Sequence, residues 1–301
     1  MDEFEVTVAI INYNTRDCLD ACLKSIEKAP PLAAHEVYVI DNASTDGSIE
    51  LLKRDYADVH IIENAGNLGF SAAANQALRT SHAKYVLILN TDTEVDTEAI
   101  DILVEFGDAH EDMGVAGPLL LNPDGTVQLS GRQFPSFFDA MAHAFLGIFW
   151  ADNPYSARYR MVDWDRQTEQ TVDWVSGAAM FVRRDAAKQV NYFDERFFMY
   201  VEDMDLCFRL WHQNWKVYFC PGAKVMHHIA KSSEQSSAKM IIEFQRSLYR
   251  FYAKNYSHTW KRFLKPLVAM GLALRAGILI VQDQVRRQLA KRGERREGQV
   301  S

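Results

Sequence analysis

Four short polar segments contain the residues best suited to chemistry. They lie at residues 41–46, 90–94, 202–203 and 227–228. The first three supply carboxylates, which bind Mg²⁺ or Mn²⁺ and can accept protons, and the fourth supplies imidazoles, which bind Mn²⁺. Together these groups can hold a nucleotide diphosphate through a divalent cation and deprotonate an acceptor.

The segment from Asn90 to Glu94 is the clearest candidate for a metal site. Asp92 and Glu94 alternate, so in an extended backbone both side chains face the same side. An alternative interpretation is a loop before a helix, with Asp96 and Glu98 among its capping residues. That alternative does not explain Asp92, which directly follows an apolar strand and precedes the cap.

The segment that begins at Asp41 has two interpretations. Asp41 follows Val-Tyr-Val-Ile and is placed to accept hydrogen bonds from a base or a ribose. Alternatively, its Asp and Ser residues cap a helix, and Asp46-Gly47 forms an ordinary turn. The turn over residues 64–67, which ends at Asn67, could offer backbone and amide groups to the same nucleotide.

Glu202 and Asp203 open a predicted helix, where the helix dipole favours acidic side chains. Asp205 has a structural partner in Arg209 at i+4. Asp203 shares a helical face with Cys207, and we expect this face to point inward. An inward carboxylate at a helix start suits a general base.

His227 and His228 follow a predicted strand near the proposed cation and diphosphate. Either could supply one imidazole ligand to Mn²⁺, although a lone histidine more often has a structural role. The residues themselves do not decide between the two.

The elements that position these groups alternate between strand and helix. Apolar runs predict strands, and 3.6-residue periodicity or alanine-rich composition predicts helices. The alternation predicts an α/β fold with a mostly parallel, doubly wound central sheet. In such sheets ligands bind beyond the carboxyl ends of the strands, where Asn12, Asp41 and residues 90–94 fall. The expected strands are 6–12, 36–40, 60–63, 85–89, 172–182 and 216–219, and the expected helices are 16–28, 69–81 and 202–211.

Within 172–182, Gly177 marks a point of close approach. Residues 131–171 are rich in aromatic side chains and lack periodicity, which is typical of an insertion or a flap. No G-x-G-x-x-G follows the first strand, which disfavours a Rossmann-type oxidoreductase.

The last segment of the chain differs in charge from the rest. The net charge of the 301 residues is −7, yet residues 260–301 hold ten Lys and Arg against three Asp and Glu. An acidic body argues against nucleic-acid binding, and the basic tail predicts an anionic membrane surface as its partner. Residues 266–281 are apolar apart from Arg275, and sixteen residues are short for a membrane span. We therefore expect an interfacial helix, with packing on the body or on a second subunit as the alternative.

The first strand begins almost at the N-terminus, which leaves no room for a signal peptide. The four cysteines show neither a CxxC pair nor the density of a disulfide scaffold. We therefore expect a cytoplasmic location, peripheral on the inner face of the cell membrane. The expected domains are 1–256 and a basic helical tail over 257–301.

The motifs, in this order, resemble the inverting GT-A glycosyltransferases of family 2, in particular their rhamnosyltransferase-like branch. Each motif is weak alone, and the ordered set is specific. The matching stretches are residues 8–14, 39–48, 64–70, 87–92, 176–180, 193–207 and 227–232. They span about three quarters of the chain.

The resemblance implies a nucleotide-sugar donor bound mainly by residues 1–125, with the acceptor and catalytic half over 126–256. It also implies a divalent cation, Mg²⁺ or Mn²⁺, held at a DXD-type motif. This chain departs from a strict DXD because Asn90 replaces the first Asp, which should weaken the metal site. The implied nucleotide-binding residues are Asn12, Asn14, Asp41, Asn67, Asn90, Thr91 and Asp92.

By the same resemblance, Asp92 and His227 hold the metal, and Asp203 is the general base with Glu202 beside it. Glu94, His228 and Gly177 are further candidates for the site. The implied reaction moves rhamnose from dTDP-rhamnose to a cell-envelope glycan or a lipid-linked acceptor. The alternatives are a galactofuranosyl- or hexosyltransferase with a UDP donor, and a non-catalytic scaffold that binds a sugar nucleotide.

Overall fold

The computed structural model describes residues 4–136, 139, 146, 150, 153–228, 237–256 and 260–297. Contacts divide the chain into two compact units. The first comprises Met1–Phe198 and Glu202–Ser232, and the second comprises Met199–Val201 and Ser233–Ser301. The long helix before residue 257 is thus grouped with the C-terminal tail.

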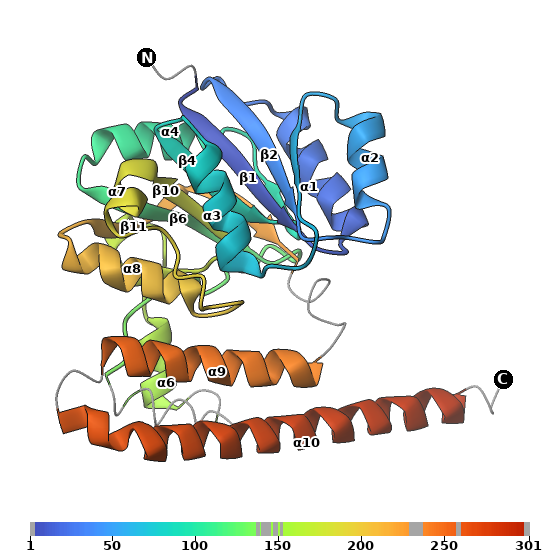
Figure 1. Cartoon of the computed structure of the whole chain (residues 1–301), viewed down its shortest axis with the longest axis vertical. Coiled ribbons are helices and arrows are strands. Elements are labelled where there is room, and N and C mark those ends of the chain that lie inside the picture. The colour runs from blue at the N-terminus through green and yellow to red at the C-terminus, as the bar shows by residue number, and fades with distance from the viewer. Residues whose placement is uncertain are drawn as a thin grey trace. The chain divides into compact units, whose positions relative to one another are not determined.

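The first unit is built on a nine-stranded sheet, with the strand order β3-β2-β1-β4-β10-β6-β11-β5 and with β8 paired to β11 (Figure 1). Strands β1, β2, β3 and β4 are parallel, as are β6 and β11, whereas β10 runs antiparallel between the two groups. The predicted mostly parallel α/β sheet is therefore confirmed. The strands are β1 (Val6–Asn12), β2 (His35–Asp41), β3 (His60–Glu63), β4 (Tyr85–Asn90), β5 (Thr93–Val95), β6 (Met113–Leu121), β8 (Gln170–Thr171), β10 (Ala179–Arg183) and β11 (Lys216–His227). A separate two-stranded sheet joins β7 (Gly131–Arg132) to β9 (Trp174–Val175).

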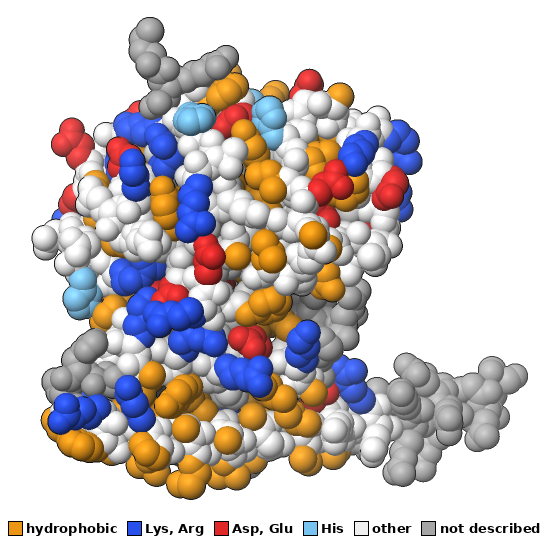
Figure 2. Space-filling view, in the orientation of Figure 1, with side chains coloured by type: hydrophobic (Ala, Val, Ile, Leu, Met, Phe, Trp, Pro, Cys, Tyr) orange, Lys and Arg blue, Asp and Glu red, His pale blue; other side chains and the backbone are white. Residues whose placement is uncertain are grey.

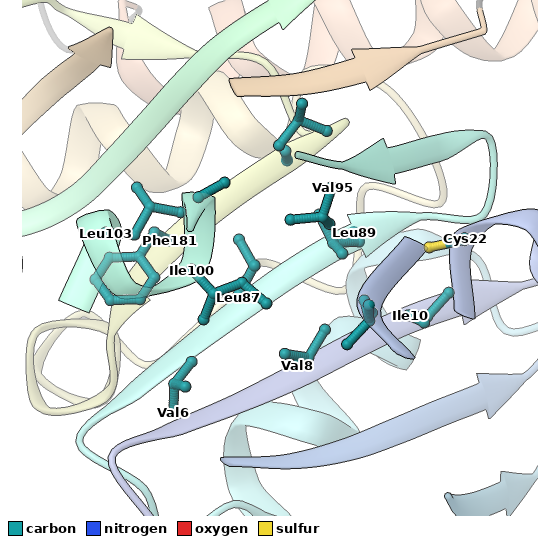
Figure 3. Packing of buried hydrophobic residues seen from close by; sticks show 14 of the residues in the cluster. Val6, Val8, Ile10, Cys22, Leu87, Leu89, Val95, Ile100, Leu103 and Phe181 are labelled. Carbon is teal, nitrogen blue, oxygen red and sulfur yellow. The ribbon is translucent and has the colours of Figure 1, made fainter. Parts of the chain in front are cut away.

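Helices cover both faces of the sheet. Val6, Val8 and Ile10 point to the face covered by α1, α2 and α4, and their side chains are fully buried (Figure 3). Helix α3 packs on β1, β2 and β4 from the other face (Figure 1). Because β4 is covered on both sides, residues 85–89 are all buried, as their uninterrupted apolar run predicts. The helices are α1 (Arg16–Lys28), α2 (Ser48–Asp55), α3 (Phe70–Thr80), α4 (Ala99–Ala109), α6 (Pro154–Arg160), α7 (Arg184–Gln189) and α8 (Glu202–His212).

Two local predictions were wrong. Residues 172–182 are not one strand, because β9 and β10 are separated at residues 176–178. The strand predicted at 216–219 continues to His227. In the alternative interpretation of residues 90–98, a helix follows the loop; α4 does begin at Ala99, although the side chain of its N-cap residue Glu98 makes no capping hydrogen bond.

The second unit contains α9 (Ser237–Asn255), a short 3₁₀ helix, η1 (Trp260–Leu264), and α10 (Lys265–Glu297). Helices α9 and α10 lie side by side (Figure 1), and Nη1 of Arg275 on α10 donates to Oε1 of Gln245 on α9 at 2.9 Å. The hydroxyl of Ser247 on α9 donates to the carbonyl oxygen of Met199 at 2.9 Å. Residues 199–201 thus pack within this unit although they directly precede α8.

Exposed apolar side chains form a stripe along η1 and α10 (Figure 2). Its members recur every three, four or seven residues, so they lie on one helical face. They are Trp260, Phe263, Leu267, Met270, Leu274, Val281 and Val285, each at least 48% exposed. By length and composition, Trp260–Val285 could also cross a membrane. The expectation that the apolar segment is too short for a span is thus corrected, because the helical apolar segment is 26 residues long.

Candidate active site

The carboxyl ends of β1, β2 and β4 bring several predicted residues together. In the sheet, Asn12 pairs with Asp41 and Ile11 with Asn90. The side-chain amide of Asn12 donates to Oδ1 of Asp41 at 2.7 Å, and the backbone N–H of Ser44 donates to Oδ2 at 2.8 Å. Asp41 is 1% exposed, so its carboxylate is used inside the protein to shape the loop after β2.

The outer part of this network is formed by Asn14 and its neighbours. Asn14 has φ 53°, and its side-chain oxygen accepts a hydrogen bond from the backbone N–H of Thr45 at 2.7 Å. The hydroxyl of Thr15 donates to Oδ1 of Asn12 and lies 2.7 Å from the hydroxyl of Thr91. Three strand ends are thereby connected by side-chain hydrogen bonds.

Asn67 lies apart from this network, in the turn before α3. Its Oδ1 accepts a hydrogen bond from the backbone N–H of Gly69 at 2.9 Å. Gly69 has φ +86°, and a Cβ atom there would lie 2.3 Å from the carbonyl oxygen of Phe198. Only glycine fits at this position. The turn itself is linked to the loop after β2, because the backbone N–H of Asn64 donates to the Asp41 carbonyl at 2.9 Å and the side-chain amide of Asn64 donates to Oδ1 of Asn42 at 3.0 Å. The side-chain amide of Asn42 in turn donates to the Gly69 carbonyl at 3.3 Å.

Asp92 and His227 face each other. Oδ1 of Asp92 lies 3.4 Å from Nε2 of His227, and Asp92 is 3% exposed. Nδ1 of His227 lies 2.8 Å from Oε1 of Gln128, whose amide nitrogen donates to the His227 carbonyl at 2.8 Å. Because the amide nitrogen of Gln128 donates to the backbone, its Oε1 can only accept a hydrogen bond from the ring. Nδ1 of His227 is therefore assigned the hydrogen. In the neutral ring, Nε2 then presents a lone pair toward a carboxylate oxygen, an arrangement that can bind a metal cation.

His228 is held by a different carboxylate. Its Nε2 lies 2.7 Å from Oε1 of Glu94, and its backbone N–H donates to the Asp92 carbonyl at 2.8 Å. Asp92, Glu94 and His228 line a small pocket that is open to solvent. The rest of its lining is Asp17, Cys18, Ala21, Thr91 and Thr93. Within the described part of the chain, no group of three His, Cys, Asp or Glu side chains is arranged to hold a metal.

Asp203 is anchored at the break between β9 and β10. The backbone N–H of Gly177 donates to Oδ2 of Asp203 at 2.8 Å, and that of Met204 donates to Oδ1 at 2.7 Å. Burial raises the pKa of Asp203, while these two N–H groups and the charge of Arg132 oppose the rise. A carboxylate with a raised pKa is a better proton acceptor, as a general base requires.

Glu202 lies beside Asp203 and is 5% exposed. Burial, and then the charge of Asp203, raise the pKa of Glu202 well above its usual value. Since two adjacent buried carboxylates resist a second negative charge, Glu202 is the member of the pair that keeps its proton. The backbone N–H of Asn90 donates to the carbonyl of Ala178 at 3.0 Å, which joins this turn to the end of β4.

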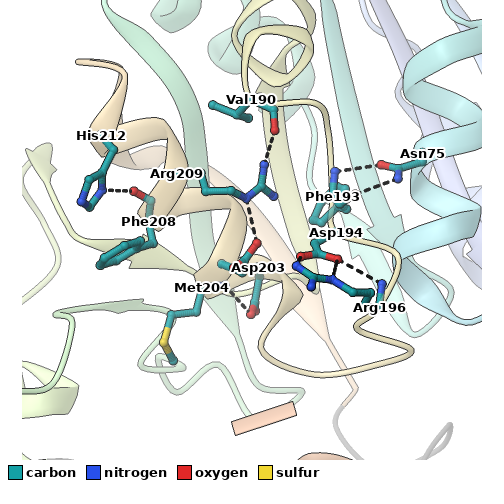
Figure 4. Close-up of polar contacts among 11 residues, drawn as sticks. Asn75, Val190, Phe193, Asp194, Arg196, Asp203, Met204, Phe208, Arg209 and His212 are labelled. Carbon is teal, nitrogen blue, oxygen red and sulfur yellow. Dashed lines mark hydrogen bonds and ion pairs between the residues drawn. The ribbon is translucent and has the colours of Figure 1, made fainter. Parts of the chain in front are cut away.

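Side-chain contacts fix the start of α8 and the preceding loop (Figure 4). Nε of Arg209 donates to Asp205 at 2.8 Å, as the i+4 spacing predicts, and its Nη1 donates to the carbonyl of Val190. Asn75 on α3 makes two hydrogen bonds of 2.9 Å with the backbone of Phe193. Because these contacts restrain α8 at its side and at the preceding loop, they hold Asp203 in place.

Three residues of the site were not predicted from the sequence. Ser44 and Gln128 act through hydrogen bonds to Asp41, Asn14 and His227, which only the fold reveals. Arg132 lies in a region without periodicity, and no motif indicates its proximity to Asp203.

The mostly parallel sheet, with polar groups at its strand ends, is the GT-A architecture of glycosyltransferases. Solved structures share this fold. The mannosyltransferase PcManGT from Pyrobaculum calidifontis, in complex with GDP-Man and Mn²⁺, aligns with a TM-score of 0.57 and 15% identity over 94% of this chain and 80% of that chain. GalNAc-T7 with UDP, GalNAc and Mn²⁺ aligns with a TM-score of 0.59 and 15% identity over 85% of this chain and 51% of that one.

The sequence comparisons define the family. The profile of glycosyl transferase family 2 matches residues 7–190, and that of glycosyl transferase family group 2 matches residues 132–285. The chain is 33% identical over 291 residues to the N-acetylglucosaminyl-diphospho-decaprenol L-rhamnosyltransferase of Mycobacterium tuberculosis, covering 93% of this chain and 94% of that protein. It is 26% identical to the rhamnosyltransferase WbbL of Escherichia coli, over 83% and 93% of the two chains. The chain therefore belongs to glycosyltransferase family 2, a family of inverting enzymes.

Proposed function

We propose that this enzyme transfers rhamnose from dTDP-rhamnose to a lipid-linked acceptor in the synthesis of a cell-envelope glycan. The observation that carries the proposal is the similarity, over nearly the whole length of both chains, to a rhamnosyltransferase that acts on N-acetylglucosaminyl-diphospho-decaprenol. The similarity to WbbL supports the same sugar.

In the proposed reaction, Asp203 is the general base. Its carboxylate takes the proton of an acceptor hydroxyl while that oxygen attacks the anomeric carbon of the donor sugar. The new C–O bond forms on the face opposite the bond to the diphosphate, which breaks, so the configuration inverts in one displacement. The N–H groups of Gly177 and Met204 orient the carboxylate.

The residues of the metal motif fit a divalent cation in part. Oδ1 of Asp92 and Nε2 of His227 are two electron-pair donors that face each other at 3.4 Å. Mg²⁺ and Mn²⁺ sites commonly use one or two protein ligands and complete their coordination with phosphate and water. When bound, such a cation supplies Lewis-acid stabilisation of the charge on the leaving diphosphate. We propose that Asp92 and His227 hold it, and that His228 with Glu94 forms the adjacent wall.

The donor nucleotide is proposed to lie across the strand ends of β1, β2 and β4. Asn12 and Asp41 are almost completely buried and bind each other. We therefore assign them to the support of the loops and assign direct contacts to the more exposed Asn14 and to Thr45. Asn67 would reach the nucleotide from the turn before α3.

The apolar stripe of α10 supports a membrane location for the acceptor reaction. Apolar side chains exposed on one helical face, with Lys261, Arg262, Lys265 and Arg287 on the same segment, are typical of helices at an anionic bilayer surface. We propose that this stripe keeps the enzyme peripheral at the membrane that contains its lipid-linked acceptor.

Calorimetric titration with dTDP-rhamnose, UDP-galactose, UDP-glucose and GDP-mannose, each with and without Mn²⁺, tests the donor. We expect binding of dTDP-rhamnose, strengthened by Mn²⁺, followed by transfer to a lipid-linked N-acetylglucosamine. Binding of a UDP-sugar alone would instead support a galactofuranosyl- or hexosyltransferase. Donor binding without transfer to any acceptor would support a scaffold.

A further inference from the structure

Arg132 is held in an unusual environment beside the proposed base. It pairs with Trp174 across β7 and β9, and its guanidinium carbon lies 4.9 Å from the Trp174 ring and 5.7 Å from the Tyr159 ring. Its Nε donates to the carbonyl oxygen of Leu129 at 2.8 Å. Two aromatic rings and one backbone contact therefore fix the guanidinium plane.

No carboxylate among the described residues forms an ion pair with Arg132. The Nε atom donates to the Leu129 carbonyl, and the Arg132 side chain also hydrogen-bonds Tyr159, which leaves part of its set of five N–H groups for another partner. A guanidinium binds planar or tetrahedral anions, phosphate oxygens included. The aromatic rings and the backbone carbonyl replace only part of the hydration that this half-buried guanidinium loses, and a bound anion would replace more of it.

A second buried guanidinium increases the positive charge in this region. Arg166 is 3% exposed and donates to the carbonyls of Trp164 and Arg160, at 2.8 and 2.7 Å. Burial, and then the charge of Arg132, lower the pKa of Arg166. The two cations therefore destabilise each other, and an anion bound at Arg132 would relieve that repulsion.

The position of Arg132 relative to Asp203 indicates which anion this is. Arg132 pairs with Trp174 on β9, and Gly177, which directly follows β9, binds the Asp203 carboxylate, so Arg132 lies on the side of the fold that holds the proposed base. The positive charge of Arg132 also acts on that carboxylate. In an inverting displacement the base and the leaving group occupy opposite faces of the transferred sugar. A cation beside the base is therefore poorly placed for the donor diphosphate and well placed for a charged group of the acceptor.

The geometry points to Arg132 as the residue that binds the diphosphate of a lipid-linked acceptor, next to the sugar whose hydroxyl is deprotonated by Asp203. This inference rests on the proposed function. It adds a specificity determinant, because an acceptor with the same sugar but no diphosphate would lack this contact.

The test uses the full chain and two acceptors with one sugar. The first is N-acetylglucosamine on a short polyprenyl diphosphate, and the second is an alkyl N-acetylglucosaminide of similar chain length without the diphosphate. For Arg132→Ala, we expect the KM of the diphosphate acceptor to rise on the order of 30-fold, the loss typical of a charge-assisted contact. The KM of the neutral acceptor and the Kd of dTDP-rhamnose should remain unchanged.

Arg132→Lys and Arg158→Ala complete the design. Lysine keeps the charge without the planar guanidinium, so it should restore only part of the affinity. Arg158 is a neighbouring exposed arginine that pairs with Asp139, so its removal should leave both KM values unchanged. Thermal unfolding of each variant identifies any loss caused by misfolding of β7.

The alternative outcomes are distinct. If Arg132→Ala impairs turnover of both acceptors equally and shifts the acidic limb of the pH–rate profile, the inference is overturned. Arg132 would then be a positioning residue for Asp203. A raised Kd for dTDP-rhamnose would overturn it in favour of a donor contact. If the wild-type enzyme uses neither acceptor, the proposed function is wrong and the inference that rests on it is overturned with it.

Discussion

Gly177 and Asp203 are joined by a hydrogen bond of 2.8 Å from the backbone N–H of the glycine to the aspartate Oδ2. The glycine lies where the chain leaves β9 and has not yet entered β10, and the aspartate lies in the first turn of α8. This bond fixes the proposed base against the sheet at the strand-end edge of the fold. The position of Asp203 therefore depends on an interrupted strand as well as on its own helix.

Replacing Asp203 with Asn should abolish transfer while donor binding survives. The amide is nearly isosteric but cannot accept the proton, so turnover should fall on the order of 10²- to 10⁴-fold. Titration with the donor should give the wild-type Kd. Asp101→Asn, which alters an acid bound to the backbone of Leu32 and Ala33, serves as the control. Turnover within threefold of wild type would remove Asp203 as the base.

Gly177→Ala should preserve the fold and impair catalysis. A Cβ at this position would lie 3.4 Å from Oδ2 of Asp203 and 3.7 Å from Oε1 of Glu202, which are ordinary contact distances. The methyl group would nevertheless occupy space that an acceptor hydroxyl needs beside both carboxylates. We expect a melting temperature close to that of wild type and a turnover reduced on the order of 10²-fold. Gly277→Ala, in open space on α10, provides the control; an active Gly177→Ala enzyme would show that the acceptor approaches elsewhere.

Glu202→Gln should stabilise the protein at neutral pH. The folded-state pKa of Glu202 is raised, so between the unfolded value of about 4.3 and the folded value the native state binds more protons than the unfolded state. Stability therefore falls as pH rises through that window, by about 1.4 kcal/mol per pH unit. Glutamine removes this loss, so its stabilising effect should be largest above the window and vanish below pH 4. Urea unfolding at pH 4, 6 and 8 measures it, and a pH-independent difference would contradict a proton-retaining Glu202.

The sequence predicts the sheet well because its strand signals are strong. The apolar runs that form β1 and β4 are typical of buried parallel strands. The polar residues that follow these strands therefore meet at the carboxyl edge of the sheet. The pairing of Asp205 with Arg209 also follows from helical spacing alone. These features depend on local periodicity.

The remaining features depend on contacts between distant segments. Gln128 contacts His227 across 99 residues of sequence, and Arg132 meets Trp174 only because β7 pairs with β9. Gly177 indicates a close approach within a strand-like run, but the sequence reveals neither the break in the strand nor Asp203 as the partner. Such residues carry no periodic signal, so the sequence does not reveal their partners.

His227→Ala and His228→Ala should separate the roles of the two histidines. Loss of the imidazole opposite Asp92 should weaken Mn²⁺-supported dTDP binding on the order of 10- to 100-fold, with little effect when Mn²⁺ is absent. Loss of His228, which pairs with Glu94, should have a smaller effect. Titration with dTDP in the presence and absence of Mn²⁺ makes the comparison, and His60→Ala on the exposed edge strand is the control. Equal effects of the two substitutions would refute the assignment of His227.

Substitution of the apolar stripe should release the enzyme from membranes without disturbing its fold. Leu267, Met270 and Leu274 are 51–65% exposed, whereas Val268 on the same helix is buried. The triple change of these three residues to Gln therefore spares the side of α10 that packs inward. Each apolar side chain withdrawn from a bilayer costs about 1.5–3 kcal/mol, so binding to anionic vesicles should fall at least 100-fold.

Sedimentation with vesicles measures this loss, and Leu32→Gln, at a 95% exposed position in the first unit, is the control. Alkaline carbonate distinguishes the two ways in which α10 can meet a bilayer. Carbonate extracts a helix that lies on the bilayer surface, because its apolar stripe and its basic residues contact the bilayer from one side only. A helix that spans the bilayer resists extraction, and three glutamines would not free it. Wild-type sedimentation of the triple variant, combined with resistance to carbonate, would replace the peripheral helix with a membrane span at Trp260–Val285.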